Sequence, residues 1–386
     1  MRKILVYAAA SATAIVVEVA QAQGSVTLYG IADAGFTYNN NQSGSKLYAL
    51  TSGDLQGSRF GLRGLENLGS GLQALFVLEN GFNILNGRLG QGNDVFGRQA
   101  YVGIASNRVG AVTLGRQYDS VVDYTGRFAV AYQWMPYEGA HPGDIDNMID
   151  TNRVNNSIKY KSPEIAGFTF GGLYSLGGVA GDFSRNQIWS IGAGYHRGSL
   201  DLGAAYLTAN DPNYSFFGNN STSNTAASNM TSPVYSGYAS AKTQQIVAVG
   251  GAYGIGNSTF GATYSNTQFK DIGALANLPA QGVEKGAAKF HNVEVNYKYQ
   301  LTPALLLGVA YDFTKGYGAN DAKYHQVMLG TDYFLSKRTD LYAAGIYQHA
   351  SGTDSTGGAA VASITSLSPS TTSNQTAIIL GIRHKF

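Results

Sequence analysis

The chain has 386 residues, of which 13% are charged and 44% are hydrophobic, and it contains no cysteine. An average soluble domain carries about 25% charged residues, so this chain has too little charge for an ordinary soluble surface and too little hydrophobicity for a bundle of membrane helices. The formal net charge of +2 gives no reason to expect a nucleic-acid partner. The absence of cysteine excludes disulfides, thiolate metal sites and cysteine catalysis.

The N-terminal segment has the pattern of an export signal. Two basic residues precede an uncharged run over residues 4–17, and small residues at the two positions that signal peptidase reads end at Ala22. The run is too short for a retained membrane anchor, which takes roughly 18 residues or more. We therefore predict that residues 1–22 are a signal peptide, cleaved between Ala22 and Gln23, and that residues 23–386 form one domain.

The remaining chain alternates with a period of two. From residue 26 to residue 36 apolar or small side chains occupy the even positions, whereas Thr27, Tyr29 and Asp33 occupy odd positions. Such alternation is typical of a strand with one apolar face, and no helical period competes with it. It predicts sixteen strands, centred near residues 30, 61, 75, 101, 113, 158, 171, 191, 204, 249, 263, 295, 308, 329, 344 and 380.

The connections between these strands fall into two classes. Tight turns are expected at residues 66–71, 106–110, 162–167, 197–199, 254–257, 300–303 and 336–339. Longer polar segments are expected at about 38–57, 80–97, 117–152, 177–186, 209–243, 268–289, 314–323 and 349–374. An even number of strands with short turns on one side and long loops on the other is typical of a transmembrane barrel.

The fold class predicted from these patterns is all-β, a sixteen-stranded antiparallel transmembrane β-barrel with long extracellular loops. A closed barrel explains the low charge, because lipid cannot satisfy backbone amides and a basic side chain at mid-depth costs roughly 2–4 kcal/mol. A soluble sandwich would not sort its turns by length, and a β-helix would show a fixed repeat, which the sequence lacks.

Several motifs resemble the general porins of beta-proteobacteria, and the resemblance covers residues 23–386. They are the runs Ser-Val-Thr-Leu-Tyr-Gly at 25–30, Ser-Arg-Phe-Gly-Leu-Arg-Gly at 58–64, Leu-Gly-Arg at 114–116, Leu-Ser-Lys-Arg-Thr at 335–339 and Gly-Ile-Arg-His-Lys-Phe at 381–386. The resemblance implies a homotrimeric outer-membrane channel whose third long loop folds into the lumen. It also implies that Phe386 is the signal read by the barrel assembly machinery. The expected partners are outer-membrane lipid, lipopolysaccharide, small hydrophilic solutes and ions.

The pore is expected to narrow between an acidic loop and a basic wall. The segment 118–152 carries six acidic residues against one permanent cation, Arg127. Alternation directs several basic side chains on neighbouring strands towards water, and the resemblance adds Arg98. The predicted wall consists mainly of Arg59, Arg98 and Arg153, supported by Arg63, Arg116 and Lys159, and it faces Asp119, Asp123 and Glu138. Strict alternation would direct Arg116 outward unless a bulge intervenes.

These charges predict an aqueous channel with a weak preference for anions. Solvated lumen residues without a role in selectivity are the plainer interpretation of each single arginine. A substrate-specific channel is the alternative function, because aromatic residues of the loop could form a local slide for one solute class. An outer-membrane hydrolase is a weaker rival. The six histidines lack metal-ligand spacing and no catalytic motif occurs, so neither an enzyme, a metal nor a cofactor is expected.

Overall fold

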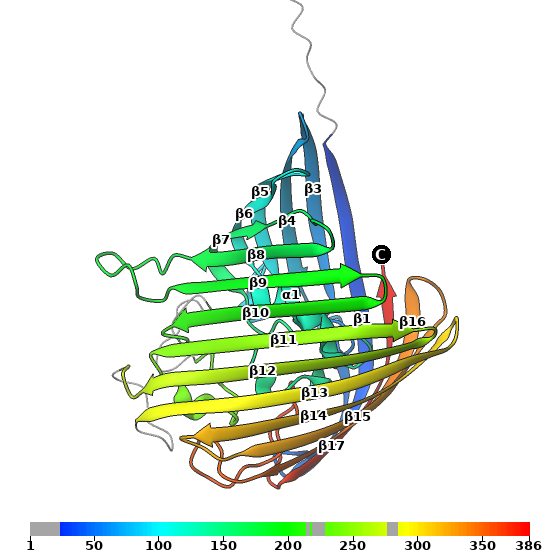
Figure 1. The fold of residues 1–386 in the computed structure, drawn as a ribbon. Coiled ribbons are helices and arrows are strands. Elements are labelled where there is room, and N and C mark those ends of the chain that lie inside the picture. Colours follow the sequence, from blue (N-terminus) through cyan, green and yellow to red (C-terminus); the bar gives the residue numbers. More distant parts are fainter. Residues whose placement is uncertain (1–23, 214–216, 218–227, 276–284) are drawn as a thin grey trace, which may run out of the picture.

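The computed structural model describes residues 24–213, 217, 228–275 and 285–386. The predicted signal peptide, with Ala22 and Gln23, lies outside these residues. In the described part of the chain every strand pairs antiparallel within one sheet, which closes on itself because β1 (Ser25–Gln42) pairs with β17 (Asn374–Lys385). The sheet wraps around the lumen as a barrel (Figure 1).

The strands follow the predicted order. Between β1 and β17 they are β2 (Ser45–Ser52), β3 (Arg59–Gly69), β4 (Leu72–Gly81), β5 (Gln99–Ser106), β6 (Gly110–Gln117), β7 (Val154–Lys161), β8 (Phe168–Ser175), β9 (Ile188–Arg197), β10 (Leu200–Asn210), β11 (Thr243–Ile255), β12 (Ser258–Ile272), β13 (Gly286–Thr302), β14 (Leu305–Gly318), β15 (Lys323–Phe334) and β16 (Thr339–Ser351). Because β2 and β3 pair with successive parts of β1, the strands occupy sixteen positions around the barrel. Each of the sixteen predicted strand centres lies within one of these strands, so the predicted fold class is confirmed.

Two of the predicted long connections are wrong. The segment 38–57 was expected to be a loop, but β1 continues to Gln42 and turns back into β2, with the rings of Tyr38 and Tyr48 5.1 Å apart. The run of asparagines at 39–41 hides this hairpin because Asn is depleted in strands. The segment 314–323 shortens to residues 319–322, since its polar residues continue the pairing of β14 with β13.

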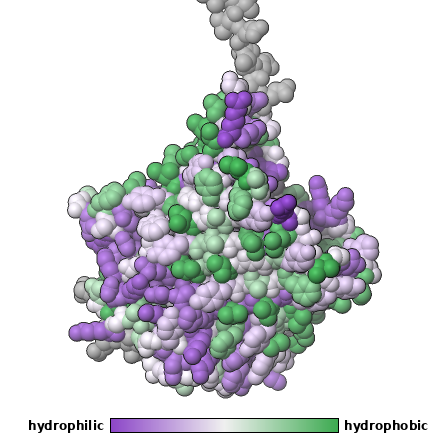
Figure 2. All heavy atoms as spheres, in the orientation of Figure 1, coloured by the Kyte–Doolittle hydropathy of each residue, from purple (hydrophilic) through white to green (hydrophobic). Residues whose placement is uncertain are grey.

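The two faces of the sheet differ as the alternation predicts. On β1 the even positions face outward, where Val26 and Leu28 are 65% and 60% exposed, whereas Asp33 is completely buried on the other face. Figure 2 shows apolar side chains spread over the outer surface of the strands that face the viewer. These side chains suit contact with hydrocarbon, while charged groups are kept for the interior.

The interior is partly filled by the long connection between β6 and β7, which we call the inward loop (residues 118–153). It contains α1 (Ser120–Tyr124) and the 3-10 turns η2 (Gly126–Phe128), η3 (Val130–Tyr132), η4 (Tyr137–Gly139) and η5 (Pro142–Asp144). The other 3-10 turns, η1 (Gln91–Asn93) and η6 (Ser236–Tyr238), lie in other connections. In Figure 1 α1 lies inside the barrel, behind β9 and β10. None of the helices in the described ranges is long and apolar enough to cross a membrane.

Glycines of the barrel wall give the inward loop room to pack. A Cβ at Gly203 would lie 1.9 Å from the carbonyl oxygen of Tyr124, and a Cβ at Gly308 would lie 2.4 Å from the ring of Trp134. Since real atoms do not approach so closely, only glycine fits at these two positions. Part of the high glycine content therefore lets the loop lie directly against the backbone of the wall.

Candidate pore constriction

The three principal arginines predicted for the basic wall lie in one row. Arg98 donates from Nε to Glu79 Oε1 (2.8 Å), and its Nη2 lies 3.6 Å from Asp150 Oδ2. Arg153 donates from Nη2 to Asp150 Oδ1 (2.6 Å). Arg59 Nε lies 3.9 Å from Glu79 Oε2. Two carboxylates thus bridge three guanidinium groups in the order Arg59, Glu79, Arg98, Asp150, Arg153, which we call the arginine row.

Tyrosines of the inward loop fix the geometry of this row. Tyr118 accepts a hydrogen bond at Oη from Arg98 (2.9 Å), and its ring lies 5.5 Å from the guanidinium carbon of Arg153. Tyr132 and Tyr137 both donate to Asp150, over 3.1 and 2.6 Å. Burial alone would lower the pKa of Arg98, but the neighbouring Tyr118 and Asp150 raise it well above its ordinary value, so Arg98 stays charged.

The predicted supporting residues adjoin the row. The register of β6 on β7 shifts between Gly115 and Gln117, as in a β-bulge. This is the irregularity that lets the side chain of Arg116 depart from strict alternation. Arg116 donates to the carbonyl oxygen of Gly97 (2.8 Å) and to the side chain of Asn155. The bulge therefore brings Arg116 next to the residue that precedes Arg98.

The other two supporting residues, Lys159 and Arg63, contact different parts of the barrel interior. Lys159 donates to the carbonyl oxygen of Tyr118 (2.9 Å) and forms an ion pair with Asp123. Arg63 is exposed, and its guanidinium carbon lies 5.6 Å from the ring centre of Tyr29. Since Arg63 follows Arg59 on β3 towards the tight turn, it extends the row of positive charge away from the long loops.

The three acidic residues predicted to face the wall do not act alike. Asp119 is completely buried, where it caps α1 by accepting from the amides of Val121 and Val122 and accepts from the side chain of Asn147. Burial raises its pKa to about 6. Asp123 is paired with Lys159, and Glu138 lies away from the row beside Asp54, as described below.

The two carboxylates of the row were not among the predicted site residues. Glu79 shares its face of β4 with Leu75 and Val77, so alternation there signals an apolar face. Asp150 stands three residues before Arg153, a spacing that could have indicated an ion pair.

The tip of the inward loop is fixed to the far wall of the barrel by His141. Its Nδ1 lies 2.7 Å from Asp146 Oδ2, its Nε2 lies 3.4 Å from Glu294 Oε2 on β13, and Asp312 on β14 lies 3.9 Å away. Ser265 on β12 donates to Asp146, and Glu294 accepts from the amide of Val130. We call this group the histidine anchor, and sequence spacing gave no sign of it.

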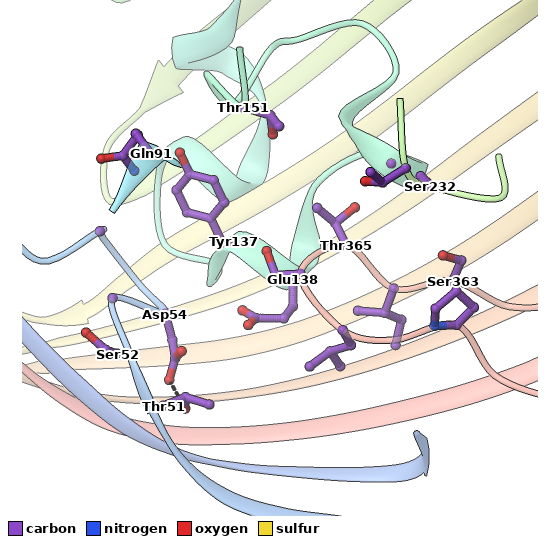
Figure 3. Close-up of a pocket in the computed structure, with 18 of the residues that line it drawn as sticks. Thr51, Ser52, Asp54, Gln91, Tyr137, Glu138, Thr151, Ser232, Ser363 and Thr365 are labelled. Atoms are coloured by element: carbon purple, nitrogen blue, oxygen red, sulfur yellow. Dashed lines mark hydrogen bonds between the residues drawn. The ribbon is translucent and has the colours of Figure 1, made fainter. Parts of the chain in front are cut away.

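The arginine row borders a cavity of about 720 Å³ on the side of the long loops. Arg98 and Arg153 line it together with Asp54 and Glu138. Figure 3 shows Glu138 projecting from the inward loop towards Asp54, which accepts a hydrogen bond from Thr51 (2.6 Å). Among the described residues, no group of three or more His, Cys, Asp or Glu side chains is placed to hold a metal ion. The cavity thus brings together two guanidinium groups and two carboxyl groups.

Comparison with known proteins identifies the family. Residues 8–354 match the family model described as "Gram-negative porin". The chain belongs to this family. It is 30% identical to an outer membrane porin protein of Bordetella pertussis over 85% of this chain and 90% of that protein, and 29% identical to outer membrane porin protein 32 of Delftia acidovorans over 95% of each.

Solved porins share the fold. The anion-selective porin from Comamonas acidovorans superposes with a TM-score of 0.73 at 23% identity, covering 94% of this chain and 100% of that one. The trimer form of OmpT from Vibrio cholerae superposes with a TM-score of 0.65 at 17% identity, covering 94% and 99%. The porin is thus a channel of the Gram-negative outer membrane and not an enzyme, as the sequence predicted.

Proposed function

We propose that this porin lets ions and small hydrophilic solutes diffuse passively through a constriction between the arginine row and the inward loop, with a preference for anions. The observation that carries the proposal is the sharing of two carboxylates, Glu79 and Asp150, among three arginines. The row therefore has one more positive than negative charge, even when Arg116 is not counted. A charged lining in a narrow, low-dielectric passage concentrates ions of the opposite sign.

Two of the three acids predicted to oppose the wall do not cancel this surplus. Asp119 is buried as a helix cap, and Asp123 is matched by Lys159. Arg63, which contacts the ring of Tyr29, adds a further positive charge on the side of the tight turns. The Comamonas porin is described as anion-selective, but at 23% identity that likeness carries the fold alone, so the selectivity proposed here rests on the charges of this chain.

The alternative of an aromatic slide for one solute class gains no support from the loop. Tyr118, Tyr132 and Tyr137 are held by the ion pairs of the arginine row, and Trp134 is buried against the wall. Their rings stabilise the constriction instead of forming a row along the passage.

We further propose that the porin assembles as a homotrimer among outer-membrane lipid and lipopolysaccharide. The Vibrio OmpT structure is described as a trimer form, which supports this assembly by family likeness. Phe386 exchanges two backbone hydrogen bonds of 3.0 Å with Gly30, so the chain end lies in the barrel seam, consistent with a part in insertion by the assembly machinery. The mass of the protein in detergent, measured by light scattering, tests the trimer.

The constriction is tested by reversal potentials in planar bilayers under a salt gradient. The wild type is expected to conduct ohmically and to favour chloride over potassium. Replacing Arg59, Arg98 and Arg153 together by glutamine should shift the reversal potential towards cation preference, because Glu79 and Asp150 then remain without their cations. Arg185→Gln, in the exposed connection between β8 and β9, is the matched control. An unchanged reversal potential in the triple variant would remove the row from the selectivity mechanism.

A further inference from the structure

Three buried polar atoms without a hydrogen-bond partner belong to side chains that line the same cavity: Gln91 Oε1 is on an uncharged amide, and the other two are on an acidic and a basic side chain. Of these two, one is the acceptor Oε2 of Glu138, and the other is the donor Nε of Arg153. One side chain is acidic and the other is basic, and both residues are more than nine-tenths buried. Leaving a buried polar atom unsatisfied costs about 1–3 kcal/mol, and more for charged groups. Their presence on one cavity points to a ligand that satisfies both.

The acidic end of the cavity is a pair of carboxyl groups. The backbone amide of Tyr137 donates to the carbonyl oxygen of Asp54 (2.7 Å), which holds Glu138 beside Asp54. Burial, followed by the charge of Asp54, raises the pKa of Glu138 well above its ordinary value, as expected where no cation is near. Figure 3 shows the two carboxyl groups directed towards each other. The pair lacks a positive partner in the described structure.

The basic end consists of Arg153 and Arg98. Arg153 uses Nη1 and Nη2 for Thr151 and Asp150, so Nε remains for a ligand. Arg98 reaches the same segment that carries Asp54, because a Cβ at Gly57 would lie 3.2 Å from its Nη1. The short segment 53–58 thus touches the carboxyl pair at one end and a guanidinium group at the other.

We propose that this cavity is a binding site for a small zwitterion, such as an amino acid, whose ammonium group contacts Asp54 and Glu138 and whose carboxylate contacts Arg153 and Arg98. The proposal rests on the proposed function, since the solute enters through the channel. It adds a preferred solute class at the extracellular side of the constriction. The hydroxyl groups of Thr51, Ser232 and Thr365, which line the cavity, suit a hydrophilic solute.

Ligands with one kind of charge fit less well. A simple anion would satisfy Arg153 but leave the carboxyl pair without a cation, and a simple organic cation would do the reverse. A metal centre is not indicated, because no group of three or more potential ligand side chains is suitably placed among the described residues. Only a solute with separated opposite charges satisfies both ends together.

The test compares three solutes that share a four-carbon chain on the reconstituted wild-type channel. They are 4-aminobutyrate, butyrate and butylammonium, added on the extracellular side while single-channel current is recorded. We expect 4-aminobutyrate to block the current at a concentration about tenfold lower than either control, because it makes charged hydrogen bonds at both ends. Equal block by butyrate would indicate an anion site, and equal block by butylammonium would indicate a cation site. Either result, or no block in a conducting channel, overturns the zwitterion site and leaves the proposed function standing.

Variants separate the site from the channel itself. Glu138→Gln should abolish the preference for 4-aminobutyrate over butyrate while ohmic conductance persists, and Asp54→Asn provides a second variant should the first fail to fold. Glu164→Gln, at an exposed position of the tight turn between β7 and β8, is the matched control and should behave as the wild type. Retention of the preference in both cavity variants would contradict the assignment. Absence of ohmic conductance in the wild type would instead contradict the proposed function, and the site with it.

Discussion

The inward loop is held at two places by ion pairs of opposite polarity. At the arginine row Arg98, next to β5, supplies the cation, and the loop supplies the carboxylate Asp150, which also pairs with Arg153 at the end of the loop. At the histidine anchor the loop supplies the cation, His141, and the wall supplies the carboxylates Glu294 and Asp312. The same type of interaction thus fixes both parts of the loop, although the charges are exchanged.

The two places differ in their access to the cavity. Arg98 and Arg153 line the cavity, whereas His141, 1% exposed in its side chain, is enclosed between the loop and three strands. We expect charges that border the cavity to act on passing ions, and charges sealed from it to contribute to the position of the loop. We therefore expect selectivity and loop docking to depend on separate ion-pair groups, which mutations can distinguish.

The largest effect is expected for Asp150→Asn. Asp150 accepts from Arg153, Tyr132 and Tyr137, and its loss leaves two buried guanidinium groups without a shared counter-charge. Breaking a buried pair by removing one partner typically costs about 3–5 kcal/mol, so the barrel should unfold at a lower temperature. Anion preference should increase at the same time, because the surplus of positive charge grows. Thermal unfolding in detergent and reversal potentials measure the two effects.

Asp182→Asn controls for the loss of a carboxylate, because Asp182 is exposed in the connection between β8 and β9. It should leave both the unfolding temperature and the reversal potential unchanged. If Asp150→Asn lowered stability without a change in selectivity, the arginine row would resemble the histidine anchor in function, and the distinction between the two places would fail.

A smaller effect is expected for His141→Gln, with a characteristic pH dependence. Burial lowers the pKa of His141, but Asp146, followed by Asp312 and Glu294, raises it well above 6.5. A raised pKa means that its stabilising contribution is complete below about pH 6.5 and is lost as the pH rises through the raised value. The groups facing His141 are Asp146 on the loop, Glu294 on β13 and Asp312 on β14, with Ser265 of β12 bonded to Asp146.

The wild-type channel should therefore show increased current noise at alkaline pH, as the loop loosens from the far wall. His141→Gln should show such noise already at neutral pH and should lack the alkaline transition, while its reversal potential stays near that of the wild type. His325→Gln, at a half-buried position of β15, serves as the control. A large change of ion selectivity in His141→Gln would contradict the separation of the two ion-pair groups.

The sequence predicted the strands well because alternation is a local property. Each strand centre was readable from the apolar face that meets lipid, as for Val26 and Leu28. The strand ends were less readable, since the asparagines at 39–41 and the polar residues at 314–318 continue the pairing without an apolar face. The strands continue to pair there through backbone hydrogen bonds, which the pattern of side chains along the sequence does not reveal.

The arginines of the site could be predicted from the sequence, but their carboxylate partners could not. Arg59 stands out because it alternates with Phe60, and Arg153 because it flanks a strand. Glu79 is concealed among apolar neighbours of its own face, and the partners of His141 come from the loop itself and from two distant strands, β13 and β14. Only the closed barrel brings these residues together, so spacing along the chain carries no signal of the histidine anchor.

The smallest effect is expected for Arg63→Gln, which tests how far the influence of the arginine row extends. Arg63 is exposed, and its contact is with the ring of Tyr29, whose hydroxyl group donates to Glu79 (3.0 Å). Salt screens exposed charges over about 10 Å at 0.1 M, so removal of Arg63 should reduce anion preference slightly at low salt and not measurably at 1 M. Replacement of Arg59, Arg98 and Arg153 should reduce anion preference at both salt concentrations, because salt screens buried charges less than exposed ones. Equal salt sensitivity of the two variants would mean that the whole positive strip, rather than the buried row, sets the selectivity.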